Sequence, residues 1–152
     1  MLRFPSLVYL QNQKTGGTFV EEFLRLHCTE SPLSYNKHAA LDSQPACFCF
    51  TNVREPLSLY RSLFTYGLDG RGGIYQRLCA NGFAGLYQQG PEGFPEWLEF
   101  MMDSKRASLL ADHYSESIAK SIGIMTWRYL RLACPDFEKA AAGLTTHSSI
   151  EA

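Results

Sequence analysis

The sequence predicts an α/β domain with a central, mainly parallel sheet flanked by helices. Two strand–loop–helix patterns support this prediction. In the first, an apolar run at residues 6–10 leads into the polar stretch QNQKTGGT, and helical spacing of apolar residues begins after Thr18, the expected N-cap. In the second, the run ACFCFTNV at residues 46–53 precedes a helix that starts at Pro56 and ends near Gly67. Each pattern matches the crossover connection that parallel strands require.

Length and composition predict one compact domain over residues 1–152. The chain is 45% hydrophobic, 13% aromatic and 19% charged, which is typical of a globular protein and excludes a disordered one. A formal net charge of -1 gives no overall attraction to nucleic acid or to an anionic membrane, so we expect neither partner. No apolar run approaches the ~20 residues of a membrane span or forms a secretory leader. We therefore expect a soluble, cytoplasmic protein; the oligomeric state stays open.

The five cysteines form an odd set without C-x-x-C spacing, and we expect mostly buried, reduced thiols. Cys47 and Cys49 alternate along a predicted strand, where such neighbours usually pack against other side chains instead of binding metal. We therefore expect no metal site.

The other expected elements follow in chain order. The run at residues 46–53 is continuous, apolar and β-branched, as in a strand buried on both faces near the centre of a sheet. The remaining predictions are a turn-rich connection over residues 28–45 with at most a short helix at 38–42, a partly helical excursion over 68–95, a helix in FPEWLEFMMDS, a strand near 122–125 and a helix after Pro135.

The first strand–helix turn has the chemistry of an anion site. Gly16, Gly17 and Thr18 present backbone N–H groups at a helix N-terminus, where the macrodipole favours negative charge. Lys14 adds a full positive charge, and Thr15 and Thr18 add hydroxyls. The alternative is an ordinary Gly-Gly turn with a solvated lysine.

This turn is not a Walker A motif, in which the lysine and a magnesium-binding Ser or Thr follow the glycines. Here Lys14 precedes Gly16 and Gly17, and no acidic residue at a strand end offers a metal partner. The pattern therefore disfavours a kinase or an ATPase.

The second turn offers another anion site. Arg54 ends the predicted strand, and Ser58 and Ser62 lie four residues apart on one face of the following helix. An ion pair between Arg54 and Glu55 is the alternative. In α/β sheets, ligands bind at the carboxyl edge of the strands, so two anion sites there suggest a ligand with two separated phosphates.

The segments QKTGGT and FTNVREPLSLYRSLF resemble the two nucleotide-binding segments of sulfotransferases that use 3'-phosphoadenosine 5'-phosphosulfate (PAPS). The resemblance is to the carbohydrate type, similar to heparan sulfate 2-O- and 6-O-sulfotransferases and their bacterial relatives. It implies a P-loop-NTPase-like three-layer sandwich with a mainly parallel sheet. It also implies that the 5'-phosphosulfate is held by Lys14, Thr15, Gly16, Gly17 and Thr18, and the 3'-phosphate by Arg54 and Ser62.

The segment YNKHAAL resembles the family segment whose histidine acts as general base, which implies that role for His38. An imidazole suits proton removal from a sugar hydroxyl near neutral pH. Many relatives carry a second arginine five positions after the first, but this chain has Leu59 there, and the nearest candidate is Arg61.

The resemblance implies transfer of the sulfuryl group from PAPS to a hydroxyl, with a carbohydrate acceptor favoured, His38 and Lys14 as catalytic residues, PAP as product and no metal. It covers residues 1–67 well and thins beyond them. Because the family's domains are longer, a further C-terminal portion that contributes to adenine or acceptor binding stays open. Two other functions also stay open: a P-loop-like nucleotide kinase or NTPase, and a non-catalytic nucleotide-binding protein.

Overall fold

A computed structural model describes residues 1–137 and 139 of the chain. These residues divide into two compact units. The first unit holds Met1–Arg54 and resumes at Arg128, and the second holds Glu55–Trp127.

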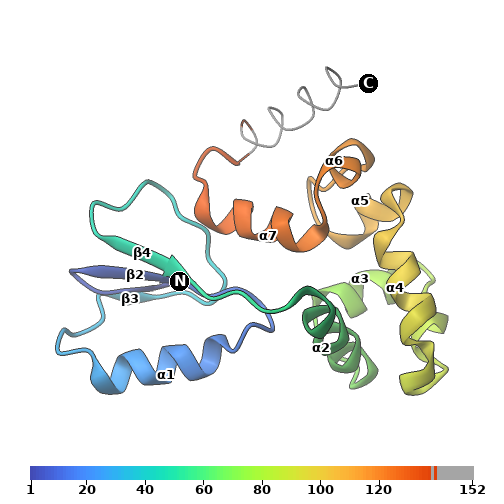
Figure 1. Cartoon of the computed structure of the whole chain (residues 1–152), viewed down its shortest axis with the longest axis horizontal. Coiled ribbons are helices and arrows are strands. Elements are labelled where there is room, and N and C mark those ends of the chain that lie inside the picture. Colours follow the sequence, from blue (N-terminus) through green and yellow to red (C-terminus); the bar gives the residue numbers. More distant parts are fainter. Residues whose placement is uncertain (138, 140–152) are drawn as a thin grey trace. The chain divides into compact units, whose positions relative to one another are not determined.

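The first unit is built on a four-stranded sheet with the order β3-β1-β2-β4. β1 pairs antiparallel with both β2 and β3, whereas β2 and β4 run parallel. Figure 1 labels β2, β3 and β4 of this sheet. The α/β prediction is confirmed, but two of these three pairings are antiparallel, so a mainly parallel sheet is not. The strands are β1 (Leu2–Arg3), β2 (Leu7–Leu10), β3 (Ser34–Tyr35) and β4 (Phe48–Thr51).

The sequence analysis did not predict β1 and β3, because each is only two residues long. So short a strand leaves no periodic pattern of apolar residues. A tight turn reverses the chain between β1 and β2, and the N–H of Phe4 donates to the Leu7 carbonyl at 2.8 Å. Pro5, with its fixed φ, lies inside this turn.

Both faces of β2 are covered. On one face, Tyr9 packs in a cluster with Val20 and Leu24 of helix α1 (Gly17–His27). On the other face, Val8 and Leu10 pack with Leu41. Burial on both sides explains the continuous apolar run that predicted this strand.

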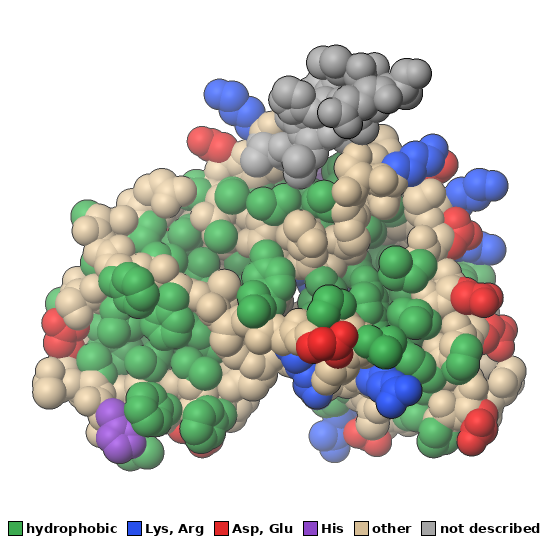
Figure 2. Space-filling view, viewed as in Figure 1, with side chains coloured by type: hydrophobic (Ala, Val, Ile, Leu, Met, Phe, Trp, Pro, Cys, Tyr) green, Lys and Arg blue, Asp and Glu red, His purple; other side chains and the backbone are tan. Residues whose placement is uncertain are grey.

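β4 was expected to be a central strand buried on both faces, and this prediction is wrong for the described sheet. β4 pairs only with β2 and lies at the edge, and the Phe48 side chain is 69% exposed. Phe50 packs on Tyr9 with ring centroids 5.1 Å apart. The apolar run in β4 therefore combines a ring that packs on β2, Phe50, with an exposed ring, Phe48. Hydrophobic side chains also gather on the surface of this unit in Figure 2, and the exposed ones include Phe19 of α1.

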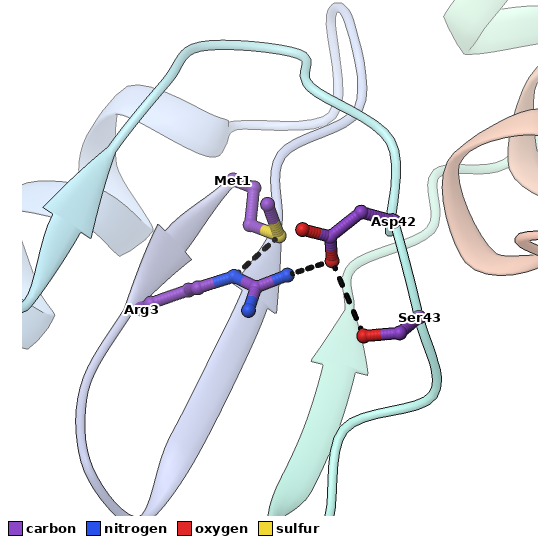
Figure 3. Close-up of polar contacts among 4 residues, drawn as sticks. All are labelled: Met1, Arg3, Asp42 and Ser43. Carbon is purple, nitrogen blue, oxygen red and sulfur yellow. Dashed lines mark hydrogen bonds and ion pairs between the residues drawn. The ribbon is translucent and has the colours of Figure 1, made fainter.

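The connection between β3 and β4 is tied to the rest of the first unit at two points. Arg3 of β1 pairs with Asp42 at 2.6 Å and also contacts Met1, as Figure 3 shows. The N–H of Leu41 donates to the Leu132 carbonyl at 2.9 Å. At most a short helix was expected at residues 38–42, and none forms there: the Ala39 N–H donates to the Asn36 carbonyl in a turn, at an N–O distance of 3.2 Å.

The second unit is helical. Its core is aromatic, with Phe64 packed on Tyr87 and Trp97 at centroid distances of 5.6 and 5.4 Å. The predicted helix in FPEWLEFMMDS is confirmed as α4. The α-helices are α2 (Pro56–Leu68), α3 (Gly73–Ala80), α4 (Phe94–Met102), α5 (Ala107–Leu110) and α6 (Glu116–Ser121), with 3-10 turns at Ala84–Tyr87, Gly90–Gly93 and Ser104–Arg106.

The last described helix, α7 (Ile124–Ala133), begins in the second unit and continues into the first. The strand expected near residues 122–125 is therefore wrong, because the apolar residues there start a helix and pack on one side of it. The helix expected after Pro135 falls largely outside the described residues. All five cysteines are free thiols, and each is half-buried. Within the described part of the chain, no helix is both long and apolar enough to cross a membrane.

Candidate functional site

The loop between β2 and α1 turns sharply at two residues. Lys14 has a φ of 60° and Gly16 a φ of 84°, both in the left-handed region. Gly16 is the N-cap of α1, so the helix begins at Gly17, two residues before the start that an N-cap at Thr18 predicts. Among the described residues, no side chain caps this helix, and its first turn carries no acidic residue. Within this described turn, no carboxylate offsets the positive end of the helix dipole, so the start of α1 is suited to bind an anion.

Thr15 closes the loop from inside. Its side chain is 8% exposed, and its hydroxyl donates to the Asn12 carbonyl at 3.1 Å. A hydroxyl has only one proton to donate, so any contribution of Thr15 to anion binding comes through its backbone N–H. Thr18, by contrast, is exposed at the first turn of α1.

Gln11 explains why the second glycine is needed. Its side chain is 1% exposed, and a Cβ placed on Gly17 would lie 2.5 Å from its Cγ. The Tyr35 hydroxyl lies 3.2 Å from Gln11 Oε1 and 2.6 Å from a carboxylate oxygen of Glu21. Gly17 therefore allows the helix start to approach the buried end of β2.

His38 lies against the same residue. Its Nδ1 is 2.9 Å from the backbone carbonyl oxygen of Gln11. Burial lowers the pKa of His38, and the nearby charges of Lys37 and Arg128 act in the same direction. The bond to Gln11 raises that pKa, but the net shift is downward. The structure thus brings the predicted base next to the loop between β2 and α1, which we call the anion loop. It also favours the neutral imidazole.

Arg54 joins the two turns. It lies three residues after the end of β4, and its Nη1 donates to the Lys14 carbonyl at 3.1 Å. The predicted adjacency of the two turns is confirmed, because β2 and β4 are parallel neighbours with Leu10 opposite Thr51. Lys14, His38 and Arg54 therefore all belong to one edge of the first unit.

The start of α2 has a different cap. The Glu55 carboxylate accepts hydrogen bonds from the N–H groups of Leu57 at 2.9 Å and Ser58 at 2.6 Å. This carboxylate takes the place that an anion would need at the helix end. A 3'-phosphate site at the second turn must therefore rely on side chains.

Ser62 is half-buried on α2, in the second unit, and its pairing with Arg54 stays a prediction. Leu59, at the position of the second family arginine, is 2% exposed and belongs to the core of that unit. Arg61 stacks over the Phe94 ring at 5.5 Å.

The sequence interpretation missed three residues at this edge: Gln11, Asn52 and Arg128. Gln11 and Asn52 are polar residues at the carboxyl ends of predicted strands, and that position was the available signal. Arg128 donates from Nη1 to Gln13 Oε1 at 2.9 Å. It comes from α7, far along the chain, where no local pattern marks it.

These residues give a donor-rich site of backbone amides, a lysine and an arginine, which suits a phosphate or a sulfate. No protein-family model, curated protein or solved structure matches the chain. Among the described residues, no group of three or more His, Cys, Asp or Glu side chains is arranged to hold a metal ion.

Proposed function

We propose that this chain is a sulfotransferase that moves the sulfuryl group of PAPS to the hydroxyl of an acceptor, with a carbohydrate favoured. The hydrogen bond from Arg54 to the Lys14 carbonyl is the observation that supports it most, because it joins, at one sheet edge, the two turns that we propose to bind anions. PAPS carries phosphate groups at opposite ends of one nucleoside, and two such turns suit it. The carbohydrate preference rests on the sequence resemblance alone.

In the proposed reaction, His38 removes the proton of the acceptor hydroxyl through Nε2. The acceptor oxygen then bonds to sulfur while the bond between sulfur and the bridging phosphate oxygen breaks. PAP departs with the bonding electrons, and the proton stays on His38. Lys14 and the loop amides stabilise the negative charge that grows on the sulfuryl and leaving oxygens. No proton transfer to the leaving phosphate is needed.

At the other end of the nucleotide, Arg54 is proposed to hold the 3'-phosphate. The P-loop-NTPase-like three-layer sandwich is also part of this proposal. Its support is the parallel pair β2–β4 together with the burial of both faces of β2, by α1 on one side and by Leu41 on the other.

A PAPS-dependent screen of carbohydrate and small-alcohol acceptors, with PAP release as the signal, tests the proposal. We expect release that depends on one acceptor class and is abolished in His38→Asn. Binding of PAP without transfer to any acceptor would indicate a non-catalytic nucleotide-binding protein. Magnesium-dependent turnover of ATP, without use of PAPS, would instead indicate a kinase or an NTPase.

A further inference from the structure

Asn52 connects the end of β4 to the anion loop through its side chain. Its Nδ2 donates to the Thr15 carbonyl, and its Oδ1 accepts from the Tyr9 hydroxyl at 2.6 Å. Its own backbone carbonyl accepts from the Tyr129 hydroxyl at 3.0 Å. All four residues belong to the first unit.

The side chains of two residues that follow β4 therefore bind two consecutive carbonyl groups of the loop. Arg54 binds the Lys14 carbonyl, and Asn52 binds the Thr15 carbonyl. In a trans peptide, the C=O and the following N–H point in opposite directions. Holding these two carbonyls toward β4 consequently turns the N–H groups of Thr15 and Gly16 away from it. At Gly16, where no Cβ restricts the left-handed backbone, these bonds supply a restraint on the preceding peptide plane that the residue itself does not.

We infer that Asn52 is a positioning residue, whose side chain sets the direction in which the anion loop presents its backbone amides. The identity of the anion, the 5'-phosphosulfate, rests on the proposed function. The positioning itself rests on the contacts of Asn52.

The Thr15 carbonyl fixes which way the Asn52 amide points. A carbonyl can only accept, so Nδ2 must face Thr15, and Oδ1 then faces Tyr9. Burial raises the pKa of Tyr9 to about 12, so its hydroxyl keeps its proton and can donate to Oδ1 at neutral pH. Tyr9 thus stabilises the amide in the orientation that the Thr15 carbonyl requires.

Asn52→Asp tests the inference, because aspartate has the same shape and keeps an acceptor for Tyr9. It replaces the donor to Thr15 by an oxygen that repels the carbonyl. We expect affinity for 5'-AMP to fall about tenfold, because one hydrogen bond is lost and the new oxygen repels the Thr15 carbonyl. Affinity for adenosine 3'-phosphate should fall less than about twofold. The matched control is Tyr129→Phe, which removes a bond to the Asn52 backbone only and should leave both affinities within about twofold.

Unchanged 5'-AMP affinity in Asn52→Asp, or an equal loss for both nucleotides, would overturn the inference. If the wild-type chain binds neither nucleotide, the proposed function fails, and a titration with inorganic sulfate decides the positioning role. A sulfate-dependent shift of the Gly16 amide resonance that disappears in Asn52→Asp would support it. The same response in both proteins, or none in either, would reject it.

If thermal melting shows that Asn52→Asp is unfolded, Tyr9→Phe takes its place. This variant keeps Asn52 but removes the hydroxyl that donates to Oδ1 of its amide and stabilises it. We expect an intermediate loss of 5'-AMP affinity, about threefold, with adenosine 3'-phosphate binding retained. No loss of 5'-AMP affinity would overturn the inference.

Discussion

Nδ1 of His38 lies 2.9 Å from the main-chain carbonyl oxygen of Gln11. Because a carbonyl cannot donate, Nδ1 must carry the hydrogen, and in the neutral ring the lone pair of the imidazole is then on Nε2. This tautomer equips His38 to accept a proton at Nε2, and burial favours the neutral ring. One backbone contact at the end of β2 therefore sets the orientation and the tautomer of the proposed base, while burial favours its neutral state.

The pKa of His38 predicts a pH dependence of activity. Because that pKa is lowered from the usual 6.5, the imidazole is neutral at pH 7, and kcat/KM should fall only as the pH drops below 6.5. A pH–rate profile of the wild-type protein measures this acid limb. His27→Asn, at an exposed position on α1, is the matched control and should keep the limb. A limb centred above 6.5 would contradict the assigned environment of His38.

The same shift predicts a change in stability with pH. Between the lowered pKa and 6.5, the unfolded chain binds more protons at His38 than the folded one does. The stabilising contribution of the neutral ring is thus complete above 6.5 and is lost as the pH falls through the lowered pKa. Urea unfolding at several pH values should show this loss in the wild type and a smaller one in His38→Asn. Identical pH dependence in the two proteins would contradict the prediction.

Lys14→Ala should lower the chemical rate more than it lowers affinity for PAP. Removing one preorganised charge partner of a developing oxyanion typically costs a factor of about 10² to 10³ in kcat. Single-turnover transfer from PAPS and calorimetric binding of PAP measure the two quantities. Lys120→Ala is the control, since Lys120 forms an ion pair with Glu116 on the surface of α6. Equal losses of rate and affinity would show that Lys14 stabilises the bound nucleotide and the transition state to the same extent.

Arg54→Ala should mainly weaken PAP binding. It removes a guanidinium from the proposed 3'-phosphate site and the hydrogen bond to the Lys14 carbonyl. Truncating a charged hydrogen-bonding group costs about 1.5–3 kcal/mol, which corresponds to about 10- to 100-fold in affinity. Arg25→Ala, which breaks an exposed pair with Glu21, is the control and should change PAP affinity little. Normal PAP affinity in Arg54→Ala would remove Arg54 from the site.

Gly17→Ala should destabilise the first unit, because the added Cβ would lie 2.5 Å from the buried side chain of Gln11. Overpacking of this kind typically costs about 1–3 kcal/mol in the free energy of unfolding. Gly73→Ala is a matched control, because Gly73 also begins a helix but its added Cβ meets nothing within 4 Å. Both tryptophans, Trp97 and Trp127, belong to the second unit, so amide hydrogen exchange in β2 is the better measurement for Gly17→Ala. Unchanged exchange there would contradict the prediction.

The site edge could be predicted from the sequence because local patterns determine it. The polar turn after an apolar strand marked the loop at Lys14, and the same pattern marked Arg54. Once both strands are assigned to a parallel pair, their carboxyl ends must meet, and the bond between Arg54 and the Lys14 carbonyl follows that geometry.

Other features depend on partners that a single segment does not reveal. The apolar run of β4 has the composition of a central strand, but the strand count beside it decides whether Phe48 is buried or exposed. Likewise, the apolar residues from Ile124 onward suit a strand or a buried helix turn equally well over so short a run. Arg128 reaches Gln13 only through the return of α7 to the first unit, which no local spacing encodes.

Calorimetric titration of the wild-type chain with PAP, in buffer without divalent metal, tests the central claim most directly. The proposed two-ended nucleotide site predicts saturable one-to-one binding, weakened in Arg54→Ala and largely kept in Lys14→Ala. Absence of binding by the wild-type chain would contradict the sulfotransferase proposal.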